Sequence, residues 1–117
     1  MQDFRNLAVW KKAHELTLSL YTASAGYPQH ETFGLRSQIR RTASNIPCRI
    51  ADGCGCSTDG EFVKFLYAAN SQASELEYLL ILSRDLHYFD EAAYDKHSAA
   101  VVEVRRMLMG LIRSINS

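Results

Sequence analysis

Arginine has the clearest chemical use in this sequence, because four arginines fall within a stretch of 14 residues. They are Arg36, Arg40, Arg41 and Arg49, and Lys11 and Lys12 precede them in the chain. A planar guanidinium group donates paired hydrogen bonds to phosphate oxygens. Residues four positions apart share a helix face, which places Arg36 beside Arg40. These six basic residues are our candidates for contacts with the phosphates of a nucleic acid.

A structural use of the same arginines is the alternative. Residues 57–90 hold six carboxylates and two basic residues, whereas residues 31–53 hold four arginines and two carboxylates. Two adjacent helices of opposite charge attract each other without any ligand. The sequence therefore leaves two interpretations open for Arg40 and Arg41, namely salt bridges to the third helix or contacts with phosphate.

The other chemically active residue types do not form a known catalytic or metal-binding pattern. Cys54 and Cys56 lie near Cys48, but zinc sites use Cys-x₂₋₄-Cys or Cys/His pairs. The run 55–60 fits the start of a P-loop, yet Glu61 stands where the phosphate-binding lysine is required. None of the four histidines follows a carboxylate by three residues, as di-iron helices require. We expect no cofactor, no metal and no enzymatic activity.

The spacing of apolar residues predicts four helices that position these side chains. Steps of three and four recur near residues 5–25, from 28–32 to about 53, from about 59 to 86, and after Asp90. No segment alternates with a period of two, so we predict no strands. The tryptophan, tyrosine and phenylalanine side chains could stack on bases, but their helical spacing favours a place in the core.

A proline lies inside the second predicted helix. Pro47 has no N–H for the carbonyl of Ala43, which costs about 3 kcal/mol in a helix interior. The apolar stripe nevertheless continues to Ile50, so we predict one proline-kinked helix. Gly53 and Gly55 are expected to end it with a left-handed cap. The stripe consists of Leu35, Ile39, Thr42, Ile46, Ile50 and Gly53.

Four helices joined by short turns pack best as an up-down-up-down antiparallel bundle. We therefore predict an all-α fold in one domain that spans residues 1–117. The first, third and fourth helices carry apolar rows beyond the one stripe that a lone bundle needs. These rows either fill a wide bundle rich in aromatic residues or face another subunit. Because exposed rows of that length are rare on monomers, we expect a homo-oligomer.

Composition bears on the cellular location of the protein and on the partners that it can attract. The formal net charge is zero, which argues against uniform electrostatic attraction to nucleic acid or to acidic membranes. Three cysteines, an odd number, argue against a secreted disulfide scaffold. No apolar run approaches the roughly 20 residues that span a bilayer. We expect a cytoplasmic protein with no membrane partner.

Several short motifs along the chain carry a family resemblance. The most specific are Gln38-Ile39-Arg40-Arg41, Ile46-Pro47 and Ile50-Ala51-Asp52-Gly53, and further matches are Val9-Trp10, Phe33-Gly34-Leu35 and Glu75-Leu76-Glu77. On these residues the chain resembles the four-helix-bundle proteins encoded in intervening sequences of large-subunit ribosomal RNA genes. Accessory proteins of diversity-generating retroelements are distant relatives of that family. Asn45, Arg49 and Asp52 depart from its usual Ser, Asn and Glu.

The resemblance implies a ring-shaped homo-oligomer, commonly a pentamer, without an established enzymatic activity. It also implies binding of RNA, DNA or a reverse-transcriptase-like protein, because the retroelement relatives bind such partners through basic surfaces. We therefore expect a non-enzymatic binding protein that presents arginines of the second helix to a nucleic acid or a nucleic-acid enzyme. The alternative is a structural protein–protein assembly module with no nucleic-acid role.

Overall fold

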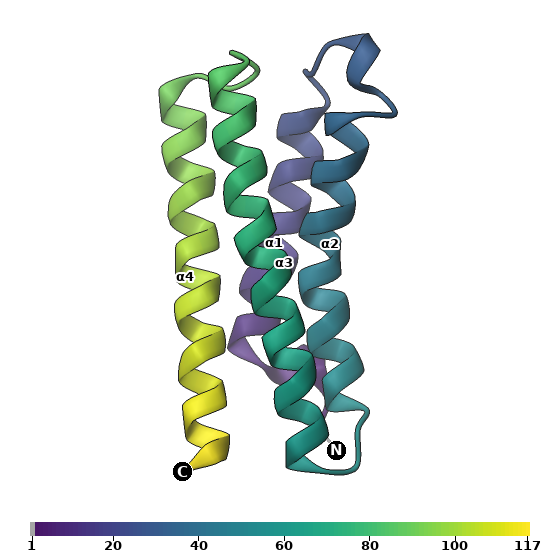
Figure 1. Cartoon of the computed structure of the whole chain (residues 1–117), viewed down its shortest axis with the longest axis vertical. Coiled ribbons are helices and arrows are strands. Elements are labelled where there is room, and N and C mark those ends of the chain that lie inside the picture. Colours follow the sequence, from purple (N-terminus) through teal and green to yellow (C-terminus); the bar gives the residue numbers. More distant parts are fainter. Residues whose placement is uncertain (1) are drawn as a thin grey trace.

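Four long helices connected by short loops form the fold. The structure is a computed structural model that describes residues 2–117. Figure 1 shows the chain reversing direction at each loop, so that both ends of the chain lie at the same end of the molecule. The prediction of an all-α four-helix fold is confirmed, and no strand occurs among residues 2–117. The elements are η1 (Phe4–Asn6), α1 (Ala8–Ser24), η2 (Gln29–Glu31), α2 (Leu35–Cys54), α3 (Asp59–Asp85) and α4 (Glu91–Asn116).

One hydrophobic core runs between the helices and uses the stripes that the sequence predicts. The six stripe residues of α2 are all buried, as are Phe62, Leu66, Ala69, Ala73, Leu76, Leu80 and Ser83 on α3. On α4 the buried stripe continues from Leu108 to Ile112, whereas Leu111 and Ile115 are only half-buried. Within residues 2–117, no helix is both long and apolar enough to cross a membrane.

The second helix begins later than the sequence predicts, at Leu35 instead of between residues 28 and 32. Glu31 supplies the cap from outside the helix, because its Oε1 accepts a hydrogen bond of 3.0 Å from the N–H of Leu35. A side chain at Gly34 would collide with this cap, since a Cβ there would lie 2.5 Å from Oε1 of Glu31. The segment before α2 is therefore a short 3-10 helix followed by a fixed turn.

The end of α2 also differs from the prediction of a left-handed glycine cap. Gly55 at the C-cap has φ −81°, and no glycine of residues 2–117 has a positive φ. Gly53 has a packing role instead, because a Cβ there would lie 2.8 Å from Cδ1 of Phe62. His87, in the loop between α3 and α4, is the one described non-glycine residue with a positive φ, at 65°.

Helix α2 continues through Pro47 as a single element. The carbonyl of Ala43, which Pro47 leaves without its helical partner, lies 3.2 Å from Oγ1 of Thr17 on α1. The same hydroxyl lies 2.8 Å from the carbonyl oxygen of Ala13, so one buried proton is shared between two helices. Thr17 thus offsets part of the cost of the proline, while a kink at Pro47 stays a prediction.

A double-mutant cycle tests this role of Thr17. We expect Thr17→Val to lower the free energy of unfolding by about 1 kcal/mol or more, because the Ala43 carbonyl loses its donor inside the protein. In a Pro47→Ala background the new N–H can bond that carbonyl, so the same change should cost clearly less. Urea unfolding of the four proteins measures both costs. Equal costs in the two backgrounds would show that Thr17 does not serve the carbonyl freed by Pro47.

Candidate functional site

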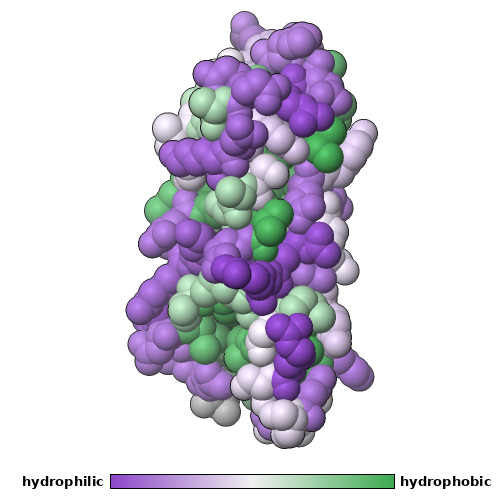
Figure 2. Space-filling view, turned by 90° about the vertical axis from the view of Figure 1, so that its left-hand side faces the viewer, coloured by the Kyte–Doolittle hydropathy of each residue, from purple (hydrophilic) through white to green (hydrophobic). Residues whose placement is uncertain are grey.

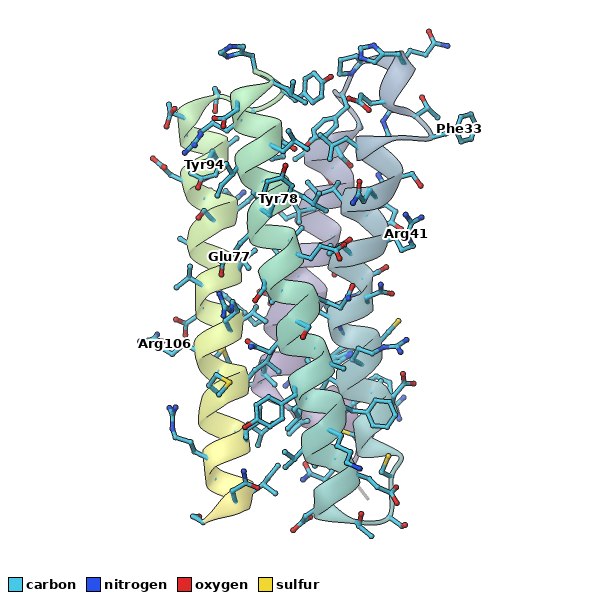
Figure 3. All side chains as sticks on the ribbon, viewed as in Figure 1. Phe33, Arg41, Glu77, Tyr78, Tyr94 and Arg106 are labelled. Carbon is cyan, nitrogen blue, oxygen red and sulfur yellow. The ribbon has the colours of Figure 1, made fainter. Side chains whose placement is uncertain are left out.

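An open groove between α1 and α2 brings three of the predicted arginines together. Its volume is about 490 Å³. Its lining consists of Tyr21, Thr32, Phe33, Arg36, Ser37, Arg40, Arg41 and Ser44, and we call it the arginine groove. No carboxylate belongs to this lining. Figure 3 shows Phe33 and Arg41 projecting from the same edge of the molecule, Phe33 from the loop before α2 and Arg41 from the helix itself.

Arg36 and Arg40 hold the C-terminal end of α1. The guanidinium of Arg36 donates to the carbonyl oxygens of Ser24 at 3.1 Å and of Tyr27 at 2.7 Å. Arg40 donates to the Ser24 hydroxyl at 2.8 Å and to the Tyr21 carbonyl oxygen at 2.9 Å, and it lies 4.8 Å from the centre of the Tyr21 ring. Carbonyls at the end of a helix carry partial negative charge, which favours cations there.

Arg40 has structural partners, but they are not the partners that the sequence predicted. Its partners belong to α1 and not to acidic residues of α3. Two carboxylates in the middle of α3 have other partners, since Glu75 accepts a hydrogen bond from Thr42 and Glu77 pairs with Arg105 of α4. Because carbonyl and hydroxyl groups are neutral, the hydrogen bonds of Arg36 and Arg40 leave their positive charges uncompensated by an ion pair.

Arg41 has a different environment from its two neighbours. It is exposed, and within residues 2–117 its side chain makes no hydrogen bond and no ion pair, while its backbone carbonyl accepts a hydrogen bond from the hydroxyl of Ser44. Its side chain is therefore available to an outside partner, whereas Arg36 already uses all three guanidinium nitrogens. Of the three arginines that line the groove, Arg41 is the one whose side chain makes no described hydrogen bond.

The structure does not bring the other three candidates to this groove. Lys12 lines a separate cavity between α1 and α4, and Lys11 is an exposed residue outside the arginine groove. Arg49 lies further along α2, where its Nε is 3.5 Å from a carboxylate oxygen of Asp52. That Nε is buried and makes no hydrogen bond. Arg49 forms a local ion pair with Asp52 and does not line the arginine groove.

The aromatic residues were predicted to lie in the core, and several do not. Phe62, Phe89 and Tyr27 are buried, but Tyr21, Tyr67, Tyr78 and especially Phe33 are exposed. Sequence reasoning missed Phe33 and Tyr21 as groove residues. A usable signal was present for Phe33, because it lies outside every apolar stripe and directly before Gly34, in the connection between two helices.

A second groove, which we call the apolar groove, continues from the first along α1 and α2. Its volume is about 460 Å³, and Tyr21 and Ser44 line both grooves. The other lining residues are mostly apolar or aromatic, namely Phe4, Trp10, His14, Thr17, Leu18, Pro47, Cys48 and Ala51. By contrast, Figure 2 shows that the face on the α4 side is largely hydrophilic, with separate hydrophobic patches. The two exposed large hydrophobic side chains of α1, Leu18 and Tyr21, both line the apolar groove.

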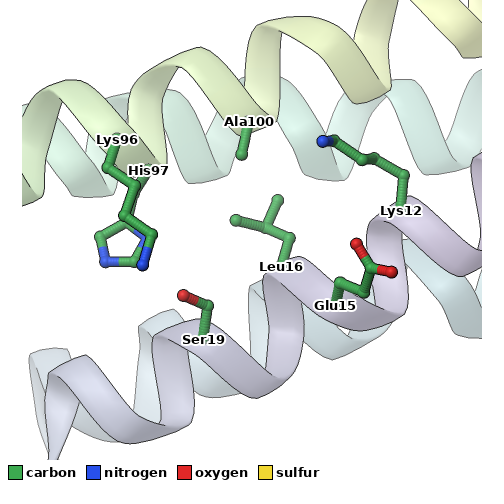
Figure 4. A pocket seen from close by; sticks show the side chains of 7 residues that line it. All are labelled: Lys12, Glu15, Leu16, Ser19, Lys96, His97 and Ala100. Carbon is green, nitrogen blue, oxygen red and sulfur yellow. The ribbon is translucent and has the colours of Figure 1, made fainter.

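A smaller cavity of about 160 Å³ lies between α1 and α4. Figure 4 shows His97 and Ser19 on facing helices in this cavity, with Lys12 and Glu15 further along α1. His97 is only 4% exposed, as expected for a lone histidine on an apolar stripe. Burial, and then the charge of Lys96, lower the pKa of His97. The imidazole is therefore held in its neutral form at neutral pH.

The cysteines and histidines do not converge on one point. Within residues 2–117 no group of three or more His, Cys, Asp or Glu side chains is placed to hold a metal ion. The three cysteines are free thiols. Burial raises the pKa of Cys54 and of Cys56, which keeps both thiols protonated.

The fold and the groove define a four-helix protein with an arginine-lined surface groove that continues into an apolar one. Residues 5–110 match the family model described as 23S rRNA-intervening sequence protein, and the chain belongs to that family. The fold is similar to a crystal structure of a protein of unknown function from the S23 ribosomal protein family of Bacteroides thetaiotaomicron. The TM-score is 0.83 at 22% sequence identity, over 90% of this chain and 95% of that chain. No curated protein matches the sequence.

The contacts of Arg40 predict a structural cost that Arg41 does not share. We expect Arg40→Gln to lower the free energy of unfolding by about 1–2 kcal/mol, because two charge-assisted hydrogen bonds to α1 are lost. Arg41→Gln removes the same charge without removing a described contact and should change stability by less than about 0.5 kcal/mol. Urea unfolding compares the two variants. Equal stability losses would contradict the difference in their environments.

The buried His97 predicts a loss of stability in mild acid. The pKa of His97 is lower in the folded state than the unfolded value of about 6.5. Between these two pKa values the unfolded chain binds more protons, so the free energy of unfolding falls as the pH drops below about 6.5. We expect His97→Gln to reduce this fall. Urea unfolding at pH 7.5 and 5.5 of both proteins measures it, and the three exposed histidines are common to both. The same fall in both proteins would rule out His97 as its source.

Proposed function

We propose that this protein is a non-enzymatic binding protein that contacts nucleic acid through the arginine groove. The observation that carries the proposal is the convergence of Arg36, Arg40 and Arg41 on a surface that no carboxylate lines. Phosphate groups are the chemical partner that such a surface fits, because guanidinium groups bind phosphate oxygens in a paired geometry. We include a cytoplasmic location in the proposal, in keeping with three free thiols.

The neutral composition of the chain does not oppose this proposal. Basic and acidic residues are equal in number, at 13 each, so attraction to phosphate depends on how the charges are distributed. Each of the five described ion pairs lies outside the arginine groove. The arginines of the groove therefore keep their positive charge, because none of them belongs to a described ion pair. Association with a polyanion at such a site weakens with salt.

The apolar groove supports a second candidate function, which is protein–protein assembly. A groove of about 460 Å³ lined by Trp10, Leu18 and Pro47 is large enough to take side chains of another protein. In this proposal the protein forms a homo-oligomer, with a pentamer as the expected assembly, or binds a reverse-transcriptase-like protein. The two functions are compatible, because the arginine groove remains a separate part of the same face.

Neutralising one exposed arginine tests the nucleic-acid role. We expect Arg41→Gln to weaken binding of a structured RNA about tenfold at low salt, because one charged phosphate contact is lost. The slope of log affinity against log salt should fall by about one unit. Fluorescence anisotropy across a salt series measures both quantities, and light scattering in the same buffer measures the mass of the protein.

The matched control is Arg106→Gln, which removes one positive charge from α4. Figure 3 shows Arg106 on the opposite side of the molecule from Arg41. This variant should bind RNA as the wild type does. If both variants lose the same affinity, binding depends on total charge and the arginine groove has no special role. If the wild type binds no RNA even at low salt, assembly through the apolar groove becomes the better account.

A further inference from the structure

We propose that the arginine groove takes a single-stranded nucleic acid, with an unpaired base stacked on Phe33 and the adjoining phosphates at Arg41. This inference rests on the proposed function and adds the class of nucleic acid and the residue that selects it. The recognised chemistry is a base face next to a phosphodiester, which RNA and DNA share. Its starting point is the position of a bare aromatic ring beside arginines in one groove.

The phenyl ring of Phe33 is almost entirely in solvent. It is 95% exposed, the highest value among the large exposed hydrophobic side chains. A phenylalanine left in water gives up the roughly 1.5–3 kcal/mol that burial of its side chain would supply. No described hydrogen bond or stacking contact holds the ring against the rest of the chain. Both faces of the ring are therefore free for a planar ligand.

The backbone on either side of Phe33 is nevertheless fixed. Before it, the hydroxyl of Thr32 donates to the carbonyl of Gln29 at 2.7 Å. After it, the cap from Glu31 holds the N–H of Leu35, and the other oxygen of Glu31 accepts a hydrogen bond of 2.9 Å from Tyr88. A stacking ring on an ordered support loses little freedom on binding, which favours affinity.

Phe33 is better suited to stacking than the other aromatic residue of the groove. The ring of Tyr21 already has the guanidinium of Arg40 at 4.8 Å from its centre, so one of its faces is occupied. The side chain of Phe33 has no polar atom, so it can recognise a base only through the face of its ring. Such stacking tolerates any base, which is how proteins bind single strands without reading sequence.

An unpaired strand fits this arrangement better than a duplex. In a duplex both faces of each internal base are covered by neighbouring base pairs, and only the phosphates remain accessible to Arg41. In a single strand a base can turn to Phe33 while its phosphates stay near the arginines. A duplex would therefore use the charge of the groove but not its aromatic ring.

The test compares single-stranded and duplex RNA of 12 nucleotides and the same sequence, by fluorescence anisotropy at low salt. We expect Phe33→Ala to weaken single-strand binding about five- to 100-fold, the loss that a stacked base represents. Duplex binding should change less than about twofold. Phe33→Trp should keep or strengthen single-strand binding, because the larger ring stacks equally well. The matching DNA strand identifies which sugar the natural ligand carries, and Phe33-dependent binding of either strand supports the proposal.

Tyr78→Ala is the matched control, because Tyr78 is also an exposed aromatic, at 59%, but lies on α3 outside the groove. It should leave single-strand binding unchanged. A 2-aminopurine base in the single strand should be quenched by the wild type and not by Phe33→Ala. If Phe33→Ala changes neither form of RNA while Arg41→Gln weakens both, the proposed function stands and this inference falls. If Phe33→Ala instead lowers the mass measured by light scattering, the ring contacts another copy of the chain, and the inference is overturned.

Discussion

The fold depends on how α2 tolerates a proline in its interior. Pro47 removes one helical hydrogen bond, and the Thr17 hydroxyl reaches the freed carbonyl of Ala43 from the neighbouring helix. The helix therefore keeps its register from Leu35 to Cys54. That register decides which α2 side chains enter the core and which reach the surface between α1 and α2. Thr17 also lines the apolar groove, so the residue that bonds the freed carbonyl also shapes the surface between α1 and α2.

The arginines of α2 combine a structural role with a positive charge that stays on the surface. Arg36 and Arg40 join the end of α1 to α2 through neutral oxygen atoms. Carboxylate partners would have joined the helices equally well but would have cancelled the positive charge. The cation at a helix C-terminus also stabilises that helix. The two arginines thereby connect α1 to α2 and keep the surface basic. The Arg41 side chain makes none of the described hydrogen bonds or ion pairs.

The sequence predicted the helices and the core better than it predicted the site. Apolar periodicity identified the stripes of α2 and α3, because burial on one helix face leaves a repeating signal. The start of α2 was missed, since Glu31 caps it from outside the helix in a way that no short motif encodes. The partners of Arg40 were also missed, because carbonyl oxygens belong to every residue and leave no trace in side-chain composition. Phe33 broke the apolar pattern, yet only the structure gives its exposure.

The two grooves form one face whose character changes along its length. Tyr21 and Ser44 belong to both, so a partner that fills the apolar groove reaches the edge of the arginine groove. Burial of the apolar part by a protein would lower the local dielectric around the neighbouring arginines and strengthen their attraction for phosphate. Assembly would in that case favour nucleic-acid binding, provided that Arg41 and Phe33 remain uncovered. Binding at one groove is therefore expected to be coupled to occupancy of the other, and such coupling must act in both directions.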